Sequence, residues 1–471
     1  MSAVRRLLQA HRAGGERLRV LSASGQLGYG IVASSLEAGL ARRPHFMGCD
    51  MGSIDPGPYY LGSGQMAAPL DMVRRDLSLV LQAARQHDIP LIIGSAGTAG
   101  ARPHLQATVD LVHEMAAELG LRFRLATIAS DVPASLMQKA LAEGRVRDLD
   151  PALTGAPLDL PDAALLSEAR MVAQCGTDRF IEALKTGPDV LIAGRACDTA
   201  IFAALPQMLG YPAGLSLHMA KIIECTSLCC EPGGRDAMMA HLGPEDFVLE
   251  SMNPGLHATP ASVAAHALYE QADPWQVEEP EGTLDLREAR YEALDAHRTR
   301  VWGACFVPRE KPTLKVEGAV RIGSRAVLLA GVADATLIGR LETVRTEVEA
   351  KVRALVPGDW TCQSHAYGLG AVRPLPQDRR STHEIGWVLE FLADTADRAR
   401  MLAAVFKQNL LHHGFPGRWS TGGNLAFALT PPELSAGDAY RFVLYHLLEG
   451  EDPATLFPIE CRAVNPAREP A

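Results

Sequence analysis

The chain of 471 residues is 47% hydrophobic and 21% charged, a composition that excludes wholesale disorder. Its formal net charge of −10, with no dense stripe of lysine and arginine, argues against nucleic acid or an anionic membrane as a partner. No apolar run is long enough to cross a membrane, and the length favours two domains.

The N-terminal segment and the cysteines both favour the cytoplasm. The residues after Met1 are amphipathic and lack the apolar core of a secretory signal. The nine cysteines are odd in number and mostly scattered, which is typical of reduced thiols rather than of a disulfide framework. We therefore expect a cytoplasmic protein.

Five segments of the first half share one pattern, a short apolar run followed at once by a loop of small residues. Helix-like stretches with apolar residues three and four apart, such as 72–85 and 104–119, lie between them. This alternation predicts a doubly wound α/β domain with a mostly parallel sheet, whose strand-to-helix loops converge at one edge. The predicted strands are 17–22, 46–48, 89–93, 122–128 and 189–193.

The sequence changes character after residue 283, so we expect a first domain of residues 1–283 and a smaller α+β domain of residues 284–471. The second domain is expected to close a cleft over the strand-end loops, with a hinge in the Pro/Glu-rich stretch 273–281. Its predicted elements are a charged helix at 284–300, a β-hairpin at 315–331, a helix at 337–355, a strand at 385–392 and a helix at 396–411.

The first strand-end loop, 25–30, has the order G-x-x-G-x-G. A dinucleotide-binding fold would have its phosphate loop here, but the glycine spacing differs from G-x-G-x-x-G. The alternative is a tight turn in an α/β sheet. The sequence therefore does not identify a cofactor.

The loop after the second strand carries two carboxylates, Asp50 and Asp55, among Gly, Ser and Pro residues that include Ser53. Paired carboxylates in a shielded loop can act as general acid and base. The alternative is that both stabilise turns, as Asp does before Gly and Pro. The loop lacks the acidic repeat of a calcium hand.

Two further strand-end loops can bind an anion. The loop 94–100 contains Ser95, Gly97 and Thr98, and its N–H and hydroxyl groups can hold a carboxylate, phosphate or thioester oxygen. In the loop 194–199, Arg195 can clamp a carboxylate while Asp198 holds the guanidinium. The alternative for the loop 94–100 is an ordinary strand-to-helix connection. The alternative for the loop 194–199 is that Arg195 and Asp198 pair only to hold the loop in place.

The segment 218–230 is the richest in reactive side chains. If it is helical, His218, Cys225 and Cys229 lie near one face, with Lys221 and Glu224 alongside. A thiolate near a histidine or lysine could then act as a nucleophile. The alternative is buried thiols that act as small hydrophobic groups. The cysteine spacing does not suit zinc, and no metal is expected. Arg235 follows in another Arg–Asp loop.

In the second domain, the loop 412–424 gathers Gly, Arg and Asn residues and contains Thr421 and Asn424. The alternatives are a cleft-closing segment and surface turn chemistry.

Taken together, these loops resemble the acyclic terpene utilisation (AtuA-like) family. The resemblance spans about residue 18 to beyond residue 427, and it rests on the strand-end loops, on D-V-L-I-A-G-R-A-C-D-T at 189–199 and on P-G-R…T-G-G-N-L-A at 416–426. It implies a role in the breakdown of acyclic terpenoids and related branched acids. The loop 94–100 lacks the Asn-containing form of the terpene proteins, so a smaller carboxylic acid or acyl thioester is an alternative substrate.

We therefore predict an enzyme of carboxylic-acid catabolism that transfers protons next to a carboxylate or thioester, as a lyase, hydratase or isomerase does. The alternatives are a Cys- or Asp-dependent hydrolase and a non-catalytic ligand-binding subunit. An anionic small-molecule substrate is expected, as is a homo-oligomer, with or without a small companion subunit. Asp50, Glu224 and Cys225 are the candidate catalytic residues, and the candidate substrate-binding residues are Ser53, Asp55, Ser95, Gly97, Thr98, Arg195, Asp198, His218, Arg235, Thr421 and Asn424.

Overall fold

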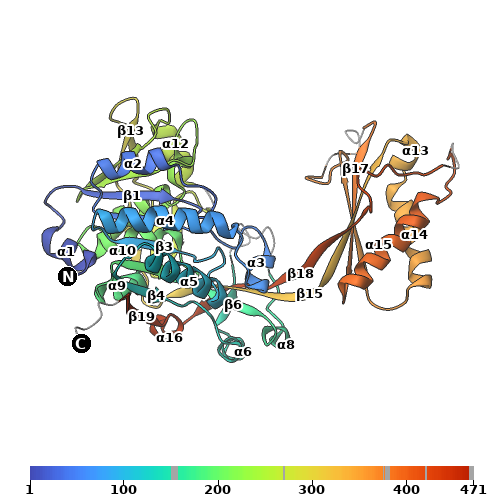
Figure 1. Cartoon of the computed structure of the whole chain (residues 1–471), viewed down its shortest axis with the longest axis horizontal. Helices are drawn as coiled ribbons and strands as arrows, with labels where there is room; N and C mark the ends of the chain where they lie inside the picture. Colours follow the sequence, from blue (N-terminus) through green and yellow to red (C-terminus); the bar gives the residue numbers. More distant parts are fainter. Residues whose placement is uncertain (150–157, 269–270, 375, 377–381, 419–421, 466–471) are drawn as a thin grey trace. The chain divides into compact units, whose positions relative to one another are not determined.

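The computed structural model divides the chain into two compact units (Figure 1). The first comprises residues 1–320 and 442–471, and the second comprises residues 321–441. From the sequence we expected a boundary at residue 284, whereas residues 284–320 and 442–471 group with the first unit. The structure describes residues 1–149, 158–268, 271–374, 376, 382–418 and 422–465.

A ten-stranded mixed sheet forms the centre of the first unit, and it confirms the predicted doubly wound α/β class. Parallel pairing is confined to its central strands β1, β2, β3, β7 and β4, which include all five predicted strands, and antiparallel strands extend it on both sides. In spatial order the strands are β12 (Arg290–Ala293), β13 (Arg298–Trp302), β9 (Asp246–Ser251), β8 (Met238–Leu242), β1 (Leu18–Ser24), β2 (Phe46–Asp50), β3 (Leu91–Gly94), β7 (Val190–Ala193), β4 (Phe123–Ile128) and β19 (Ile459–Val464).

Helices connect these strands and lie against them. The helices of the first unit are α1 (Ala3–Ala10), α2 (Ala33–Ala41), α3 (Pro58–Ser63), α4 (Leu70–Gln86), α5 (Arg102–Glu118), α6 (Ala134–Ala142), α8 (Ala163–Leu166), α9 (Thr177–Lys185), α10 (Asp198–Met208), α11 (Ala213–Ile223), α12 (Pro260–Ala267) and α16 (Pro453–Leu456), with the 3₁₀ helix η1 (Thr226–Cys229).

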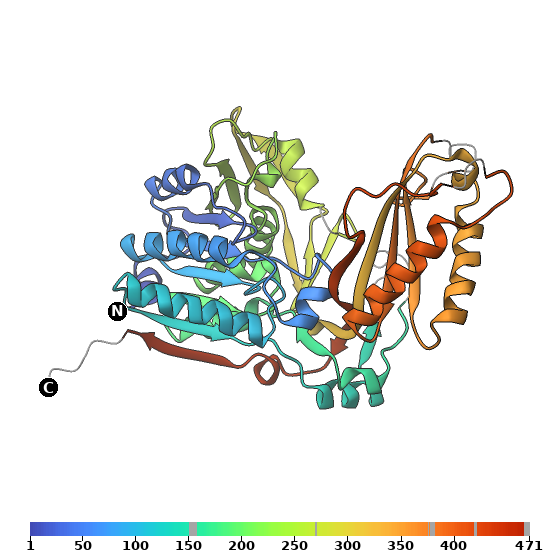
Figure 2. The ribbon, with the colours of Figure 1, turned by 45° about the vertical axis from the view of Figure 1, so that its right-hand side comes forward.

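The central strands are short and apolar because both of their faces are buried. Alternate side chains enter two separate cores: Phe46 and Ile92 pack with residues of α9 and α10, whereas Met47 and Ile93 pack with residues of α4 and α5. Figure 2 shows α4 and α5 side by side along one face. This burial fixes the sheet and, with it, the loops at its carboxyl edge.

The other strands form two smaller sheets. One has the order β10 (Gln276–Glu279), β11 (Gly282–Asp285) and β14 (Cys305–Pro308). The other has the order β16 (Thr361–Tyr367), β17 (Ile385–Ala393), β15 (Thr313–Val332), β18 (Glu433–Glu449) and β5 (Val146–Asp148), and β6 (Arg170–Ala173) also pairs with β15. The long strands β15 and β18 contribute residues to both units.

The second unit packs helices α13 (Ala335–Ile338), α14 (Leu341–Leu355) and α15 (Ala396–Leu411) on its strands. Strand β17 buries every second side chain, including Trp387 and Phe391, and Phe391 contacts Phe406 of α15 with ring centroids 5.1 Å apart. The antiparallel sheet with helices agrees with the predicted α+β character, and α15 has the predicted bounds.

Two predicted elements were wrong. Residues 284–300 form strands rather than a helix, because the Asp295 carboxylate accepts the N–H groups of His297 and Arg298, each at 2.9 Å, in the turn between β12 and β13. Residues 315–331 form one strand rather than a hairpin, since the first part of β15 pairs with β6 and its second part with β17. No helix in the described part of the chain is long and apolar enough to cross a membrane.

Candidate active site

Loops from the parallel strands meet at one edge of the main sheet. The N–H of Met51, just after β2, donates to the carbonyl of Gly94 at the end of β3 over 3.0 Å. The loop after β3 joins the loop after β7 through the N–H of Arg195, which donates to the carbonyl of Gly100 over 3.0 Å. The loops that were predicted to converge are thus in contact.

Asp50 is the last residue of β2, and it is 6% exposed. The N–H of Gly52 donates to its carboxyl group, but Oδ1 is buried and makes no hydrogen bond. Burial, followed by the charge of Asp198, raises the pKa of Asp50 well above its ordinary value, and Glu224 acts in the same direction. Asp50 is therefore a buried acid whose surroundings favour the protonated form.

Arg195 is held by the protein itself. Its Nε and Nη2 donate to the two carboxylate oxygens of Glu317 over 2.8 and 3.2 Å, and its Nη1 donates to the Ser95 hydroxyl and the Ala196 carbonyl, each over 3.1 Å. Asp198 Oδ1 lies 3.8 Å from Nη1. A guanidinium has five N–H donors, so this geometry does not leave a parallel pair for the bidentate grip on a ligand that we expected. Arg195 instead fixes the loops that surround it.

The loop after β3 also serves the architecture. Ser95 and Thr98 are buried with positive φ values of 50° and 89°, and Gly97 has a φ of 59°. Ser95 Oγ accepts from Arg195, and the N–H of Thr98 donates to the Ser95 carbonyl over 3.0 Å. None of the three lines the cavity described next. Their expected contact with substrate stays a prediction.

A cavity of about 1160 Å³ opens at this edge, and every residue that lines it belongs to the first unit. The polar inner part of its lining, here called the floor, consists of the buried residues Arg195, Thr199, Lys221, Glu224 and Glu279 and of Asp198, whose side chain is 27% exposed. The remaining walls come from residues 271–280 and 309–315, from β5 and β18, and from the loop after β2, which contributes Ser53 and Asp55.

Lys221 and Glu224 form a buried ion pair on the floor. Lys221 lies in the last turn of α11, and Glu224 is the C-cap residue of that helix. The Lys221 Nζ lies 2.6 Å from Glu224 Oε1, and the two side chains are 8% and 4% exposed. A positive side chain is favourable near a helix C-terminus, which helps to place Lys221 here. The pair offers a carboxylate and an ammonium group to the cavity.

Glu279 adds a second buried carboxyl group to the floor, beside that of Glu224. The Thr199 hydroxyl donates to its Oε2 over 3.0 Å. Burial, followed by the charge of Glu281, raises the pKa of Glu279 to about 8. Burial also raises the pKa of Glu281 to about 7, although the N–H of Asp178 in the first turn of α9 donates to it over 3.0 Å. The floor therefore combines two carboxyl groups that lie near cations, those of Glu224 and Asp198, with Glu279, whose pKa is raised.

The glycine loop after β1 is filled by a carboxylate of the protein. Asp76 of α4 is fully buried and accepts the N–H groups of Gly28, Gly30 and Ile31 over 3.0, 2.9 and 3.0 Å. A phosphate bound here would need the same donors. The tight-turn interpretation of this loop therefore agrees better with the structure than the dinucleotide interpretation.

Three further candidate residues, His218, Arg235 and Asn424, are not among those that line the cavity. His218 is buried against Phe247 and Tyr291, and burial lowers its pKa to about 3. Helix α11 ends before Cys225, so the predicted common face of His218 and Cys225 does not form. Arg235 donates to Gln26 Oε1 over 3.0 Å at the surface, and Asn424 donates to the carbonyls of Leu410 and His413 over 3.3 and 3.0 Å. Thr421 lies outside the described residues.

Cys225 is poorly placed to be a nucleophile. It is not among the residues that line the cavity. Burial, followed by the charges of Glu224, Asp198 and Asp50, raises the pKa of its thiol, whereas a reactive cysteine needs a lowered pKa.

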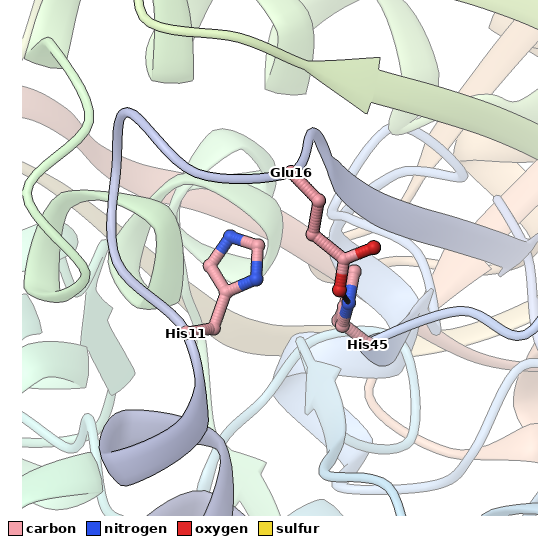
Figure 3. A group of neighbouring side chains, drawn as sticks. All are labelled: His11, Glu16 and His45. Carbon is pink, nitrogen blue, oxygen red and sulfur yellow. Dashed lines mark hydrogen bonds and ion pairs between the residues drawn. The ribbon is translucent and has the colours of Figure 1, made fainter.

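A second cluster of ionisable groups, His11, Glu16 and His45, brings three ligand atoms within 4.8 Å of one another (Figure 3). His45 Nδ1 accepts the N–H of Arg19 over 2.9 Å, so the proton of the neutral ring is on Nε2, which faces Glu16 Oε1 at 3.1 Å. Arg19 Nη1 lies 3.1 Å from Glu16 Oε2. A metal needs an unprotonated nitrogen and is repelled by a neighbouring cation. The cluster is better described as a hydrogen-bonded ion-pair network.

The sequence interpretation missed two carboxylates and undervalued a lysine. Glu279 lies in the stretch taken for a hinge, and Glu317 lies in the strand taken for a hairpin. A charged residue at an inward position of an apolar alternation, as in K-V-E-G-A-V at 315–320, was the available signal for Glu317. Lys221 stood beside Glu224 in the sequence, but its ion pair depends on where α11 ends.

Comparison with known proteins gives one match. The family model described as "Acyclic terpene utilisation family protein AtuA" matches residues 71–232 and 247–427, which together cover well over half of the chain. Searches of curated proteins and of solved structures found no match.

Proposed function

Because this chain belongs to the acyclic terpene utilisation family AtuA, we propose that it is an enzyme of carboxylic-acid or acyl-thioester catabolism. The family identity confirms the resemblance stated from the sequence and links the chain to acyclic terpene utilisation. The specific chemistry that we propose is proton transfer at the carbon next to a carboxylate or thioester, as in a lyase, hydratase or isomerase.

The observation that carries this proposal is the buried Lys221–Glu224 pair at the floor of a cavity of about 1160 Å³. The Glu224 carboxylate removes the proton, and the Lys221 ammonium stabilises the negative charge that develops on the carbonyl oxygen. Asp50 is a positioning residue in this scheme, because burial and the charges of Asp198 and Glu224 favour its protonated form, which limits the negative charge beside Glu224. The expected homo-oligomer, the companion subunit and the cytoplasmic location stay predictions.

Deuterium exchange tests the proposal without knowledge of the complete reaction. The protein is incubated in D₂O with a panel of short and branched carboxylic acids and their coenzyme A thioesters, and loss of the α-proton signal is followed by NMR. We expect exchange with one chemical class, and a fall of about 10²–10⁴-fold in its rate for Glu224→Gln. Lys221→Met is expected to slow exchange as well.

Cys225→Ala is the matched control, because Cys225 adjoins Glu224 in the chain but does not line the cavity. It should exchange at the wild-type rate. Full exchange by Glu224→Gln would show that the base lies elsewhere, and thioester hydrolysis that is lost only in Cys225→Ala would favour the hydrolase alternative.

A further inference from the structure

Carboxyl groups outnumber cations around the cavity floor. Three carboxyl groups line it, and two more, those of Asp50 and Glu317, are buried next to it. Against these five groups stand Arg195 and Lys221, together with Lys315, whose Nζ lies 3.8 Å from Glu317 Oε1. The walls add four cations and five carboxylates, so the excess of carboxyl groups remains: Arg145, Arg147, Arg309 and Lys311 against Asp55, Asp273, Glu278, Glu310 and Glu449. If every group were ionised, the region would carry an excess of negative charge in a poorly solvated environment, which is unfavourable.

One acceptor atom in this region lacks a partner. Asp50 is 6% exposed, and its Oδ1 makes no hydrogen bond in the described structure. The charged groups that influence it are Asp198 and Glu224 on the floor, and Arg195. A buried acceptor without a donor is costly and points to a missing ligand.

We propose that the cavity floor binds a positively charged group, which is either an ammonium group of the substrate or a hydrated divalent ion that accompanies it. This inference rests on the proposed function, since it describes the ligand of the same site. An anionic ligand alone would increase the excess of negative charge, whereas one positive charge offsets it.

Ligand geometry narrows the choice of cation. A magnesium or manganese ion held by three protein oxygens at about 2.1 Å requires those oxygens to lie within about 4.2 Å of one another. Among the described residues, the floor has no three His, Cys, Asp or Glu side chains whose ligand atoms all lie within even 4.8 Å of one another. A metal ion here would therefore keep several water ligands, and an ammonium group, with N···O distances up to about 4 Å, fits the wider spacing directly.

In the absence of a cation, protons offset the charge. Asp50 has a pKa raised well above its usual value, first by burial and then by Asp198, and Glu279 has a pKa of about 8. A bound cation stabilises the ionised carboxyl groups, so its binding releases a proton to the solvent near neutral pH. Binding of an anion would take up a proton instead.

Calorimetric titration tests the inference. The protein is titrated separately with two cations, Mn²⁺ and n-butylammonium, and with the anion butyrate as a comparison. Each titration is run at constant ionic strength in two buffers of different ionisation heat, so that released protons are counted. The floor variants are Asp198→Asn and Glu279→Gln. Glu310→Gln is the control, since Glu310 is an exposed carboxylate on the wall of the same cavity.

We expect one of the two cations to bind at a single site with release of a proton, and the floor variants to weaken this binding by about tenfold or more. Glu310→Gln should bind as the wild type does. The cation that binds identifies the source of the charge. The inference is overturned if neither cation binds, if the floor variants bind as tightly as the wild type, or if butyrate binds with proton uptake. Binding is read without turnover, so deuterium exchange would still test the proposed function separately.

Discussion

Arg195 Nε donates a hydrogen bond to Glu317 Oε2 over 2.8 Å, although the two residues are 122 positions apart in the chain. Arg195 is 4% exposed and Glu317 is fully buried. Burial acts to raise the pKa of Glu317, but the positive charges of Arg195 and Lys315 hold that pKa below its usual value. The pair joins β15 to the loops at the carboxyl edge of the main sheet and thereby defines one side of the cavity floor.

Removal of one member of this pair is expected to destabilise the protein strongly. In Glu317→Leu, the guanidinium of Arg195 stays buried without its counterion, which costs about 3–5 kcal/mol in the free energy of unfolding. Urea denaturation of the full chain, followed through the unfolding of its first unit, measures this loss. The double variant Arg195→Met/Glu317→Leu should lose much less than the sum of the two single variants. A loss below about 1 kcal/mol in Glu317→Leu would mean that the pair does not hold the floor together.

A second prediction concerns the approach of two loops. A Cβ atom at Gly100, where φ is +67°, would overlap the backbone nitrogen of Arg195. Gly144 has nearly the same φ of +68° but open space around its Cα, so it is a matched control. Gly144→Ala should cost about 1–2 kcal/mol for the left-handed backbone alone. Gly100→Ala should cost roughly 1–3 kcal/mol more, because the loops must separate. Equal losses in thermal or urea denaturation would contradict this close contact.

The third prediction concerns the carboxylate that fills the glycine loop after β1. Asp76→Asn removes the negative charge that three backbone N–H groups share, so we expect a loss of about 2–3 kcal/mol in the free energy of unfolding. Asp71→Asn, an exposed change on the same helix, should cost less than about 1 kcal/mol. If Asp76→Asn were as stable as the wild type and bound a free phosphate or dinucleotide, the loop would be a ligand site after all.

The sequence was a good guide wherever short-range pattern determines structure. The apolar runs predicted the five central strands, and the spacing of apolar residues predicted α15 to the residue, because both patterns follow from which side chains are buried. Convergence of the strand-end loops followed from parallel topology. The sequence did not predict which buried charges pair with each other. Glu317 lies beside Arg195 only because the long strand β15 brings it there from 122 positions away in the chain. For the same reason Arg195 was interpreted as a ligand clamp, and Glu279 went unnoticed.

The last prediction concerns the pH dependence of stability. His218 is fully buried beside Tyr291, and burial lowers its pKa from 6.5 to about 3. The unfolded chain therefore binds a proton below pH 6.5 that the folded protein does not, so this contribution to stability is present above pH 6.5 and is lost as the pH falls toward 3.

The variant His218→Gln has no imidazole to protonate, so it should not lose stability in this way. Its free energy of unfolding relative to that of the wild type should rise as the pH is lowered from 6.5. His87→Gln, an exposed control at the C-cap of α4, should follow the wild-type profile in urea denaturation. Parallel profiles for His218→Gln and the wild type would show that His218 is protonated in the folded protein.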